Sequence, residues 1–129
     1  ADYALELMTS DSLRSWMNMI RKGATMAMEA WDDTFKPNQD WNHAWGAAPA
    51  NIIPRGLCGI RPLSPGFGMF DVNPQIASLS SVSLRQPTKH GPIELEIQNG
   101  RMELAVPEGT RGIFRKQVLT PGKHCMNLC

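Results

Sequence analysis

Apolar residues in the first part of the chain recur at helical spacing. The most regular stripe follows the i, i+3, i+4, i+7 rule of a helix with one buried face. It consists of Leu13, Trp16, Met17 and Ile20. Leu5 and Met8 share one face of a preceding helix, and Ser10 or Asp11 can cap the second helix. Two helices joined by a short turn form an antiparallel pair, which is the unit of helical bundles and barrels.

A second region of helical pattern follows a polar loop at residues 34–40. The run WNHAWGAAPANIIPRG places Trp41 and Trp45 near one face of a predicted helix. Pro49 either kinks this helix or marks the start of a new one. The run LCGIRPLSPGFG at residues 57–68 predicts a rigid linker.

The second half of the chain changes to the alternation of β-strands. Apolar residues alternate with glutamates over residues 93–97, and a second alternating run occupies residues 102–106. The pair Asn99-Gly100 between them is typical of a type I′ hairpin turn, whose central residues both have positive φ. Further strands are predicted at residues 78–86 and within TRGIFRKQV and GKHCMNL. Five or six short antiparallel strands with one apolar face indicate a small β-sandwich.

These patterns predict an α+β protein in two parts, a helical segment at residues 1–66 and a β-sandwich domain at residues 67–129. The helical segment is too small to bury much apolar surface by itself. We therefore expect it to pack on the sandwich, to form an oligomer through exposed faces near Met17 and Ile20, or to belong to a larger barrel. The chain begins in helical pattern without a methionine, which is expected of a fragment of a longer protein.

Composition excludes several classes of function. The 129 residues are 42% hydrophobic and 19% charged, which is typical of a globular domain. The net charge is +1 and the richest basic run is Arg21-Lys22, so no nucleic-acid partner is expected. Apolar stretches are too short to span a bilayer, so we expect no membrane partner. No phosphate loop, nucleophile elbow or nucleotide fingerprint occurs, and no cofactor is predicted.

Cysteines and histidines do not predict a metal site. The cysteines are Cys58, Cys125 and Cys129, and an odd number argues against a complete disulfide framework. Cys125 and Cys129 lack the two-residue gap common in zinc sites and have only His124 beside them, while His43 lacks a second ligand at suitable spacing. We expect buried thiols or a free thiol near the end of the chain, and no metal.

The candidate chemistry centres on Glu29, in the run GATMAMEAWDD. Apolar neighbours and Trp31 would remove water from this carboxyl, which would raise its pKa and suit proton transfer. Most glutamates in such a run are nevertheless solvated. The residues that follow concentrate carboxylates, an imidazole and three of the four tryptophans. They are Trp31, Asp32, Asp33, Asp40, Trp41, His43 and Trp45.

This combination is typical of a carbohydrate site, because carboxylates move protons and hold hydroxyls while indole faces stack on sugar rings. The alternative is structural. Trp41 and Trp45, four residues apart, would then be helix core, and His43 a core or capping residue.

The same region resembles a known enzyme family. GATMAMEAWD, followed by DWNHAWGAAPANIIPRGLCGIRPLSPGF, is similar to the C-terminal part of bacterial α-L-rhamnosidases. In that family a segment G-A-T-x-x-x-E-x-W-D precedes an Asn-His pair that opens a helix. The upstream run YALELMTSDSLRSWMNMIRK resembles the preceding helices of the family's (α/α)6 barrel, whereas the strand half matches in pattern only. The resemblance implies helices of an incomplete barrel followed by a C-terminal β-sandwich.

The family implies removal of terminal α-L-rhamnose from glycans or glycosides by inverting hydrolysis, in which one carboxylic acid protonates the leaving oxygen and another activates water. By motif, Glu29 falls on the general base, His43 on the histidine that contacts rhamnose, and Trp31 on a wall of the pocket. Asp32 and Trp41 join them as candidate substrate-binding residues. The family's general acid lies upstream of the matched segment, so the isolated chain is expected to be inactive.

Two other functions are open at this point: a carbohydrate-binding module in which the sandwich is the functional part, and a structural brace without catalysis. The strand half has only Phe114 after Phe70, whereas sugar-binding sandwiches show several exposed aromatics. Met26 and Met28 stand where the family has a threonine and an aromatic, and the loop after the base is short. The pocket lining and the sugar preference are therefore open.

Overall fold

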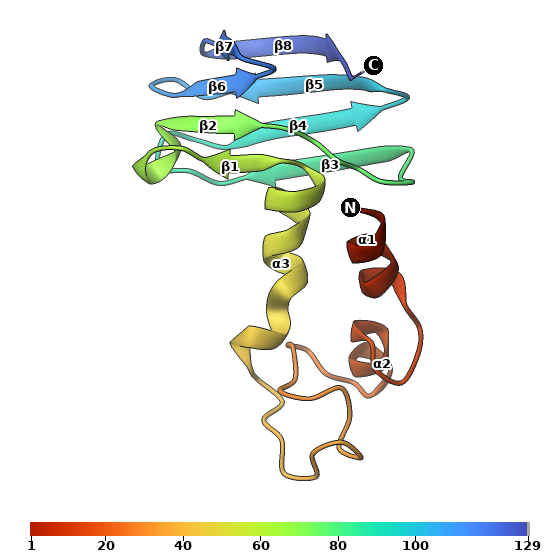
Figure 1. Ribbon diagram of the computed structural model, residues 1–129. Helices are drawn as coiled ribbons and strands as arrows, with labels where there is room; N and C mark the ends of the chain where they lie inside the picture. Colours follow the sequence, from red (N-terminus) through yellow and green to blue (C-terminus); the bar gives the residue numbers. More distant parts are fainter. Residues whose placement is uncertain (129) are drawn as a thin grey trace. The chain divides into compact units, whose positions relative to one another are not determined.

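The computed structural model describes residues 1–128, which form two compact units. The first unit is Ala1–Ile52, and the second begins at Ile53. The first unit is helical and irregular, and the second is built from strands (Figure 1). Helices followed by a β-sandwich confirm the predicted fold class. No helix among residues 1–128 combines the length and the apolar character that crossing a membrane requires.

The first unit contains four short helical elements. They are α1 (Asp2–Thr9), α2 (Trp16–Arg21), the 3-10 turn η1 (Ala44–Ala47) and α3 (Ala48–Ile52). The Ser15 hydroxyl caps α2, because it accepts a hydrogen bond from the Asn18 N–H at 3.1 Å. The predicted cap at Ser10 or Asp11 is therefore wrong. The second helix thus begins directly after Ser15 and is only six residues long.

The face that α2 buries is also different from the predicted one. Leu13 and Ile20, from the predicted apolar stripe, are 68% and 64% exposed. The buried residues of α2 are Asn18 and Met19. Asn18 Nδ2 donates to the Trp31 carbonyl at 3.0 Å, which turns the polar face of the helix toward the following segment. Leu13, Met17 and Ile20 consequently lie at the surface of the described chain, whereas Trp16 is half-buried.

Residues 22–43 join α2 to η1 through turns and bends, without a helix or strand. Trp41 precedes the helical elements, so the prediction that it shares a helix face with Trp45 is wrong. Pro49 lies in the first turn of α3, and the helical elements follow one another without a break from residue 44 to residue 57.

The second unit opens with a π-helical turn, η2 (Ile53–Leu57), and contains two four-stranded sheets in the described residues. One sheet has the order β1 (Ile60–Pro62), β2 (Met69–Val72), β6 (Arg111–Phe114) and β7 (Gln117–Leu119). The other has the order β3 (Ser81–Gln86), β4 (Ile93–Gln98), β5 (Arg101–Val106) and β8 (Gly122–Asn127). Strands β2 and β6 pair in parallel, and the other pairs are antiparallel.

Alternation in β4 and β5 builds the core of the sandwich, as the sequence predicts. Leu95 pairs with Leu104 across the two strands, and both side chains are buried. They share one apolar cluster with Phe70 and Val72 of the other sheet, so the two sheets pack through a common interior. The buried Cys58 belongs to this cluster, and its burial raises the pKa of the thiol to about 11.

Turn residues account for the remaining differences. Asn99-Gly100, with φ of 51° and 74°, confirms the predicted type I′ hairpin. Arg115 and Lys116 also have positive φ and split TRGIFRKQV into β6 and β7. The predicted linker at residues 57–68 instead contributes strand β1 and the 3-10 turn η3 (Pro65–Phe67). Cys125 is exposed, and Cys129 lies outside the described residues.

Candidate functional site

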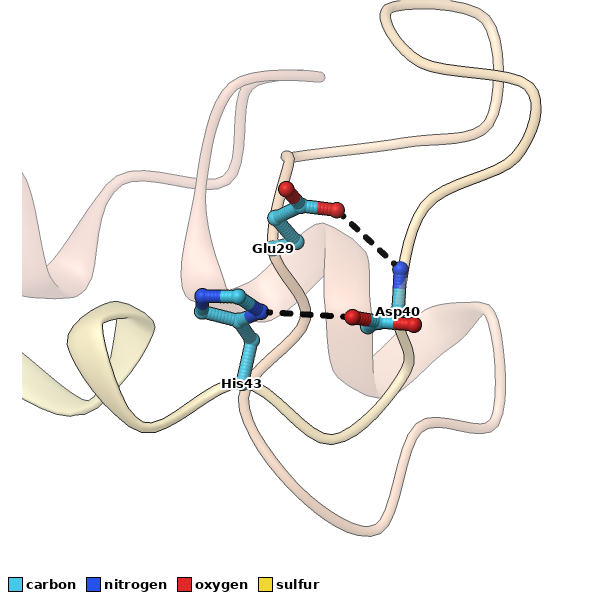
Figure 2. Close-up of side chains that lie close together, drawn as sticks. All are labelled: Glu29, Asp40 and His43. Carbon is cyan, nitrogen blue, oxygen red and sulfur yellow. Dashed lines mark hydrogen bonds and ion pairs between the residues drawn. The ribbon is translucent and has the colours of Figure 1, made fainter.

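Two segments of the first unit, residues 27–29 and 40–43, lie antiparallel, and Glu29 is on the first of them. The Glu29 N–H donates to the Asp40 carbonyl at 2.9 Å, and the His43 N–H donates to the Ala27 carbonyl at 2.8 Å. The Asp40 N–H in turn donates to Glu29 Oε2 at 3.2 Å. Figure 2 shows the side chains of Glu29 and His43 both directed at Asp40. Backbone pairing therefore brings residues that are eleven or more positions apart to one place.

The other carboxylate oxygen of Glu29, Oε1, accepts a hydrogen bond from the Lys36 ammonium and forms an ion pair with it. The Glu29 side chain is 18% exposed. The hydrogen bond from Lys36, followed by the Asp40 N–H, lowers the pKa of Glu29 below its ordinary value. The predicted rise in this pKa is therefore wrong, because a cation from the next loop outweighs the loss of solvation. The carboxylate is ionised at neutral pH.

His43 lies between Asp40 and Trp45. Its Nδ1 is 3.7 Å from Asp40 Oδ2, and its ring stacks on the Trp45 indole with centroids 4.7 Å apart. The ligand atoms of Glu29, Asp40 and His43 all lie within 4.8 Å of one another, so these three side chains could approach a metal ion. The ammonium of Lys36 already supplies positive charge at the Glu29 carboxylate. That ammonium competes with a divalent ion, and we assign no metal here.

Glu29 opens on a hollow of about 390 Å³ with aromatic walls. The lining residues are Trp16, Met19, Met28, Glu29, Ala30, Trp31, Trp45 and Gly46. Trp16 and Trp31 meet edge to face, with ring centroids 5.0 Å apart and planes at 86°. Trp16 Nε1 donates to the Gly46 carbonyl at 2.7 Å, which fixes the indole on the segment after His43. A single carboxylate thus shares a mostly apolar hollow with three indoles.

Asp32 lies in a different environment, with its carboxylate buried in the protein. Oδ1 accepts a hydrogen bond from the Thr34 N–H at 3.0 Å, and Oδ2 accepts one from Asn18 Nδ2 at 3.1 Å. Lys22 Nζ lies 3.2 Å from Oδ2. The Thr34 N–H, then Asn18, lowers the pKa of Asp32 to about 2. Both oxygens are used within the unit, where they fix the turn after Trp31.

Trp41 is held by Asp33, away from the residues that line the hollow. Its Nε1 donates to Asp33 Oδ1 at 3.3 Å, and Gln39 Nε2 donates to the same oxygen at 2.9 Å. The buried Gln39 also accepts a hydrogen bond from the Ala30 N–H at 2.8 Å. Gln39 therefore ties the loop to the segment that carries Glu29.

The structure brings Glu29 and Trp31 to one hollow and places His43 close to Glu29, as the sequence suggests. Asp32 and Trp41 do not line the hollow, and their contact with substrate stays a prediction. Sequence reasoning missed Lys36 and Trp16. Trp16 belongs to the predicted helix stripe, and that pattern does not indicate that it also lines the hollow. Lys36 lies in an irregular loop, where no periodic pattern can indicate its position.

The comparisons with known proteins assign this arrangement to a class. Residues 1–57 match the family model described as the bacterial alpha-L-rhamnosidase 6 hairpin glycosidase domain. Residues 59–119 match the model of the bacterial alpha-L-rhamnosidase C-terminal domain. The class is therefore that of the glycoside hydrolases whose helical glycosidase domain continues into a β-sandwich. The chain belongs to the bacterial α-L-rhamnosidase family.

Individual relatives are similar to this chain in sequence or in fold. An alpha-L-rhamnosidase from Alteromonas sp. (strain LOR) is 28% identical over an alignment of 102 residues that covers 73% of this chain and 11% of the relative. The alpha-L-rhamnosidase structure from Aspergillus terreus has a TM-score of 0.80 at 19% identity, over 98% of this chain and 17% of that one. The one from Streptomyces avermitilis, complexed with L-rhamnose, has a TM-score of 0.70 at 24% identity, over 86% and 12%. The chain thus spans a small share of these proteins.

Proposed function

We propose that the chain is the C-terminal part of a longer α-L-rhamnosidase and supplies the general base of an inverting hydrolysis. In this proposal Glu29 activates water, Trp31 forms a wall of the sugar site, and His43 contacts the rhamnose. The general acid and the rest of an (α/α)6 barrel come from outside this chain. The substrate class is a glycan or glycoside that ends in α-L-rhamnose.

The observation that carries the proposal is the state of Glu29. A general base must be ionised before it can accept a proton from water, and the lowered pKa of Glu29 meets this condition while it reduces the basicity of the carboxylate. The carboxylate also faces a hollow with indole walls, which suit the apolar face of a deoxy sugar. Membership of the rhamnosidase family supplies the reaction class.

The inverting part of the proposal has a geometric consequence. The second carboxyl group of an inverting glycosidase stands about 6.5–9.5 Å from the base, which leaves room for the attacking water. In the longer enzyme, a general acid from an upstream helical hairpin should lie at that distance from Glu29. Proton NMR of the first product should show β-L-rhamnose from an α-linked substrate. Initial release of α-L-rhamnose would contradict inversion.

Glu29→Gln in the longer enzyme tests the base. The substitution keeps the shape of the side chain and removes its basicity, so kcat on a nitrophenyl α-L-rhamnoside should fall by about 10²–10⁴-fold. Glu108→Gln is the matched control, because Glu108 is exposed in the second unit and should leave kcat unchanged. A Glu29→Gln enzyme with near-normal kcat, alongside an unaffected control, would show that another group is the base.

The isolated chain of 129 residues should release no rhamnose from the same substrate, because it carries no assigned general acid. Turnover by the purified chain would sink this part of the proposal. The alternative of a sugar-binding sandwich has less support. No tryptophan, tyrosine or phenylalanine is among the exposed apolar residues of the second unit as far as residue 128, so a flat aromatic platform for a sugar is not found there.

A further inference from the structure

We infer that Lys36 is a positioning residue, which fixes the orientation of the Glu29 carboxylate in the hollow lined by the three indoles. The inference rests on the proposed function of Glu29 and adds a partner that the family motif does not contain. Lys36 is not among the residues that line the hollow, and it acts through its contact with the Glu29 carboxylate.

The first observation is that the two Glu29 oxygens have different donors from the same loop. Lys36 Nζ pairs with Oε1, and the Asp40 N–H donates to Oε2 at 3.2 Å. A carboxylate with one donor can still rotate about its last torsion, whereas two donors on opposite oxygens define its plane. A base that must meet one water molecule in one direction depends on such orientation.

The second observation is that the backbone of Lys36 is itself fixed. The N–H groups of Phe35 and Lys36 donate to the Asp32 carbonyl at 3.0 and 3.3 Å, and the Gln39 N–H donates to the Lys36 carbonyl at 3.1 Å. The Asp32 carboxylate is anchored below this turn by Asn18 Nδ2. The buried network around Asp32 thus holds the turn from which the ammonium reaches Glu29.

The titratable groups close to Glu29 make the inference testable. They are Lys36, which pairs with it, and Asp40 and His43, whose side chains complete the cluster. The Lys36 side chain is 42% exposed, and half-exposed ion pairs contribute little to folding. Loss of the Lys36 ammonium should therefore leave the first unit folded and change the pKa and the orientation of the Glu29 carboxylate.

The first experiment follows the Glu29 carboxyl carbon by NMR titration in the 129-residue chain, which requires no turnover. Lys36→Met should raise the Glu29 midpoint, since the loss of an adjacent opposite charge and of its hydrogen bond raises a carboxyl pKa. Lys36→Arg, which keeps the charge, should restore most of the shift. The matched control is Lys22→Met, which removes a cation from Asp32 and should leave the Glu29 midpoint in place.

The second experiment measures the pH dependence of kcat/KM in the longer enzyme. The acid limb reports the base of the free enzyme, so Lys36→Met should move it upward by the shift seen in the NMR titration. The kcat at neutral pH should fall about tenfold or more with KM little changed, because the base is misdirected while sugar contacts remain. Lys36→Arg should recover part of the loss.

The outcomes separate this inference from the proposed function. An unmoved Glu29 midpoint in folded Lys36→Met overturns the positioning role, whatever the activity of Glu29→Gln. A shifted midpoint with an unchanged acid limb also overturns it, since the pair would then exist without serving the base. An active Glu29→Gln enzyme refutes the proposed function directly, while the titration still reports whether Lys36 holds Glu29.

Discussion

The first unit should be unusually sensitive to loss of a single buried side chain. Among residues 1–52, only Met19 and Met28 are buried apolar residues, and Met28 has no exposed surface. Met28 precedes Glu29 and lines the same hollow. Met28→Ala removes most of this buried side chain, which costs about 2–5 kcal/mol in protein cores.

This cost is large against the stability that such a unit can have. At about 0.05–0.15 kcal/mol per residue, a unit of this length has roughly 3–8 kcal/mol in total, and its small apolar core favours the lower end. We therefore expect Met28→Ala to leave the first unit largely unfolded in buffer. The second unit has a core of its own and should remain folded.

Tryptophan fluorescence separates the two units, because all four tryptophans lie within residues 1–52. The emission of Met28→Ala should shift to the red as the indoles become solvated, while the far-UV circular dichroism loses its helical part and keeps the signal of the sheets. Met26→Ala, at a side chain that is 57% exposed two residues away, should match the unmodified chain. Native emission and an unchanged urea midpoint for Met28→Ala would refute the view that this side chain supports the unit.

Two further predictions concern pH and backbone conformation. The folded pKa of Asp32, about 2, is below its ordinary value of 3.8, so the unfolded first unit binds more protons in this range. Fluorescence-detected stability should therefore fall as pH drops from 3.8 towards 2, and Asp32→Asn should flatten this dependence. In the second unit, Gly59 and Gly122 both have positive φ, but a Cβ on Gly59 would lie 2.0 Å from the Asn73 carbonyl oxygen, whereas Gly122 has open space. Gly59→Ala should lower the urea midpoint of the sheets far more than Gly122→Ala, which carries only a strain of about 1–2 kcal/mol; equal midpoints would contradict the close approach.

Much of the sandwich could be predicted from sequence, because period-two alternation and turn chemistry act locally. The buried faces of β4 and β5 and the turn at Asn99-Gly100 follow directly from residue order. The parallel pairing of β2 with β6 could not be predicted, since it joins residues 42 positions apart and has no local pattern. The two-residue turn at Arg115-Lys116 was also hidden, because neither residue is a usual positive-φ type.

In the first unit, a motif predicted the candidate site better than periodicity did. The family motif selected Glu29, and the structure adds what the motif cannot show, namely the donors that keep its carboxylate ionised. Periodicity predicted a buried face for Leu13 and Ile20 that is exposed in the described chain. The error has a physical reason, because a helical stripe shows that a face requires an apolar partner but does not show that the partner is within the same chain.

The interior of the first unit relates the fixed Glu29 carboxylate to the exposed apolar side chains near α2. Its buried residues are mostly polar; one of them caps α2, and the other three bond to the segments that carry or face Glu29. They are Ser15, Asn18, Asp32 and Gln39. A network of this kind orients groups well but adds little net stability, because its hydrogen bonds replace those made with water. Leu13, Met17 and Ile20, the exposed residues of the stripe, then form the face on which further helical hairpins of the proposed enzyme would pack. Those hairpins would supply the apolar burial that stabilises the first unit, whereas the orientation of Glu29 would come from residues of this chain.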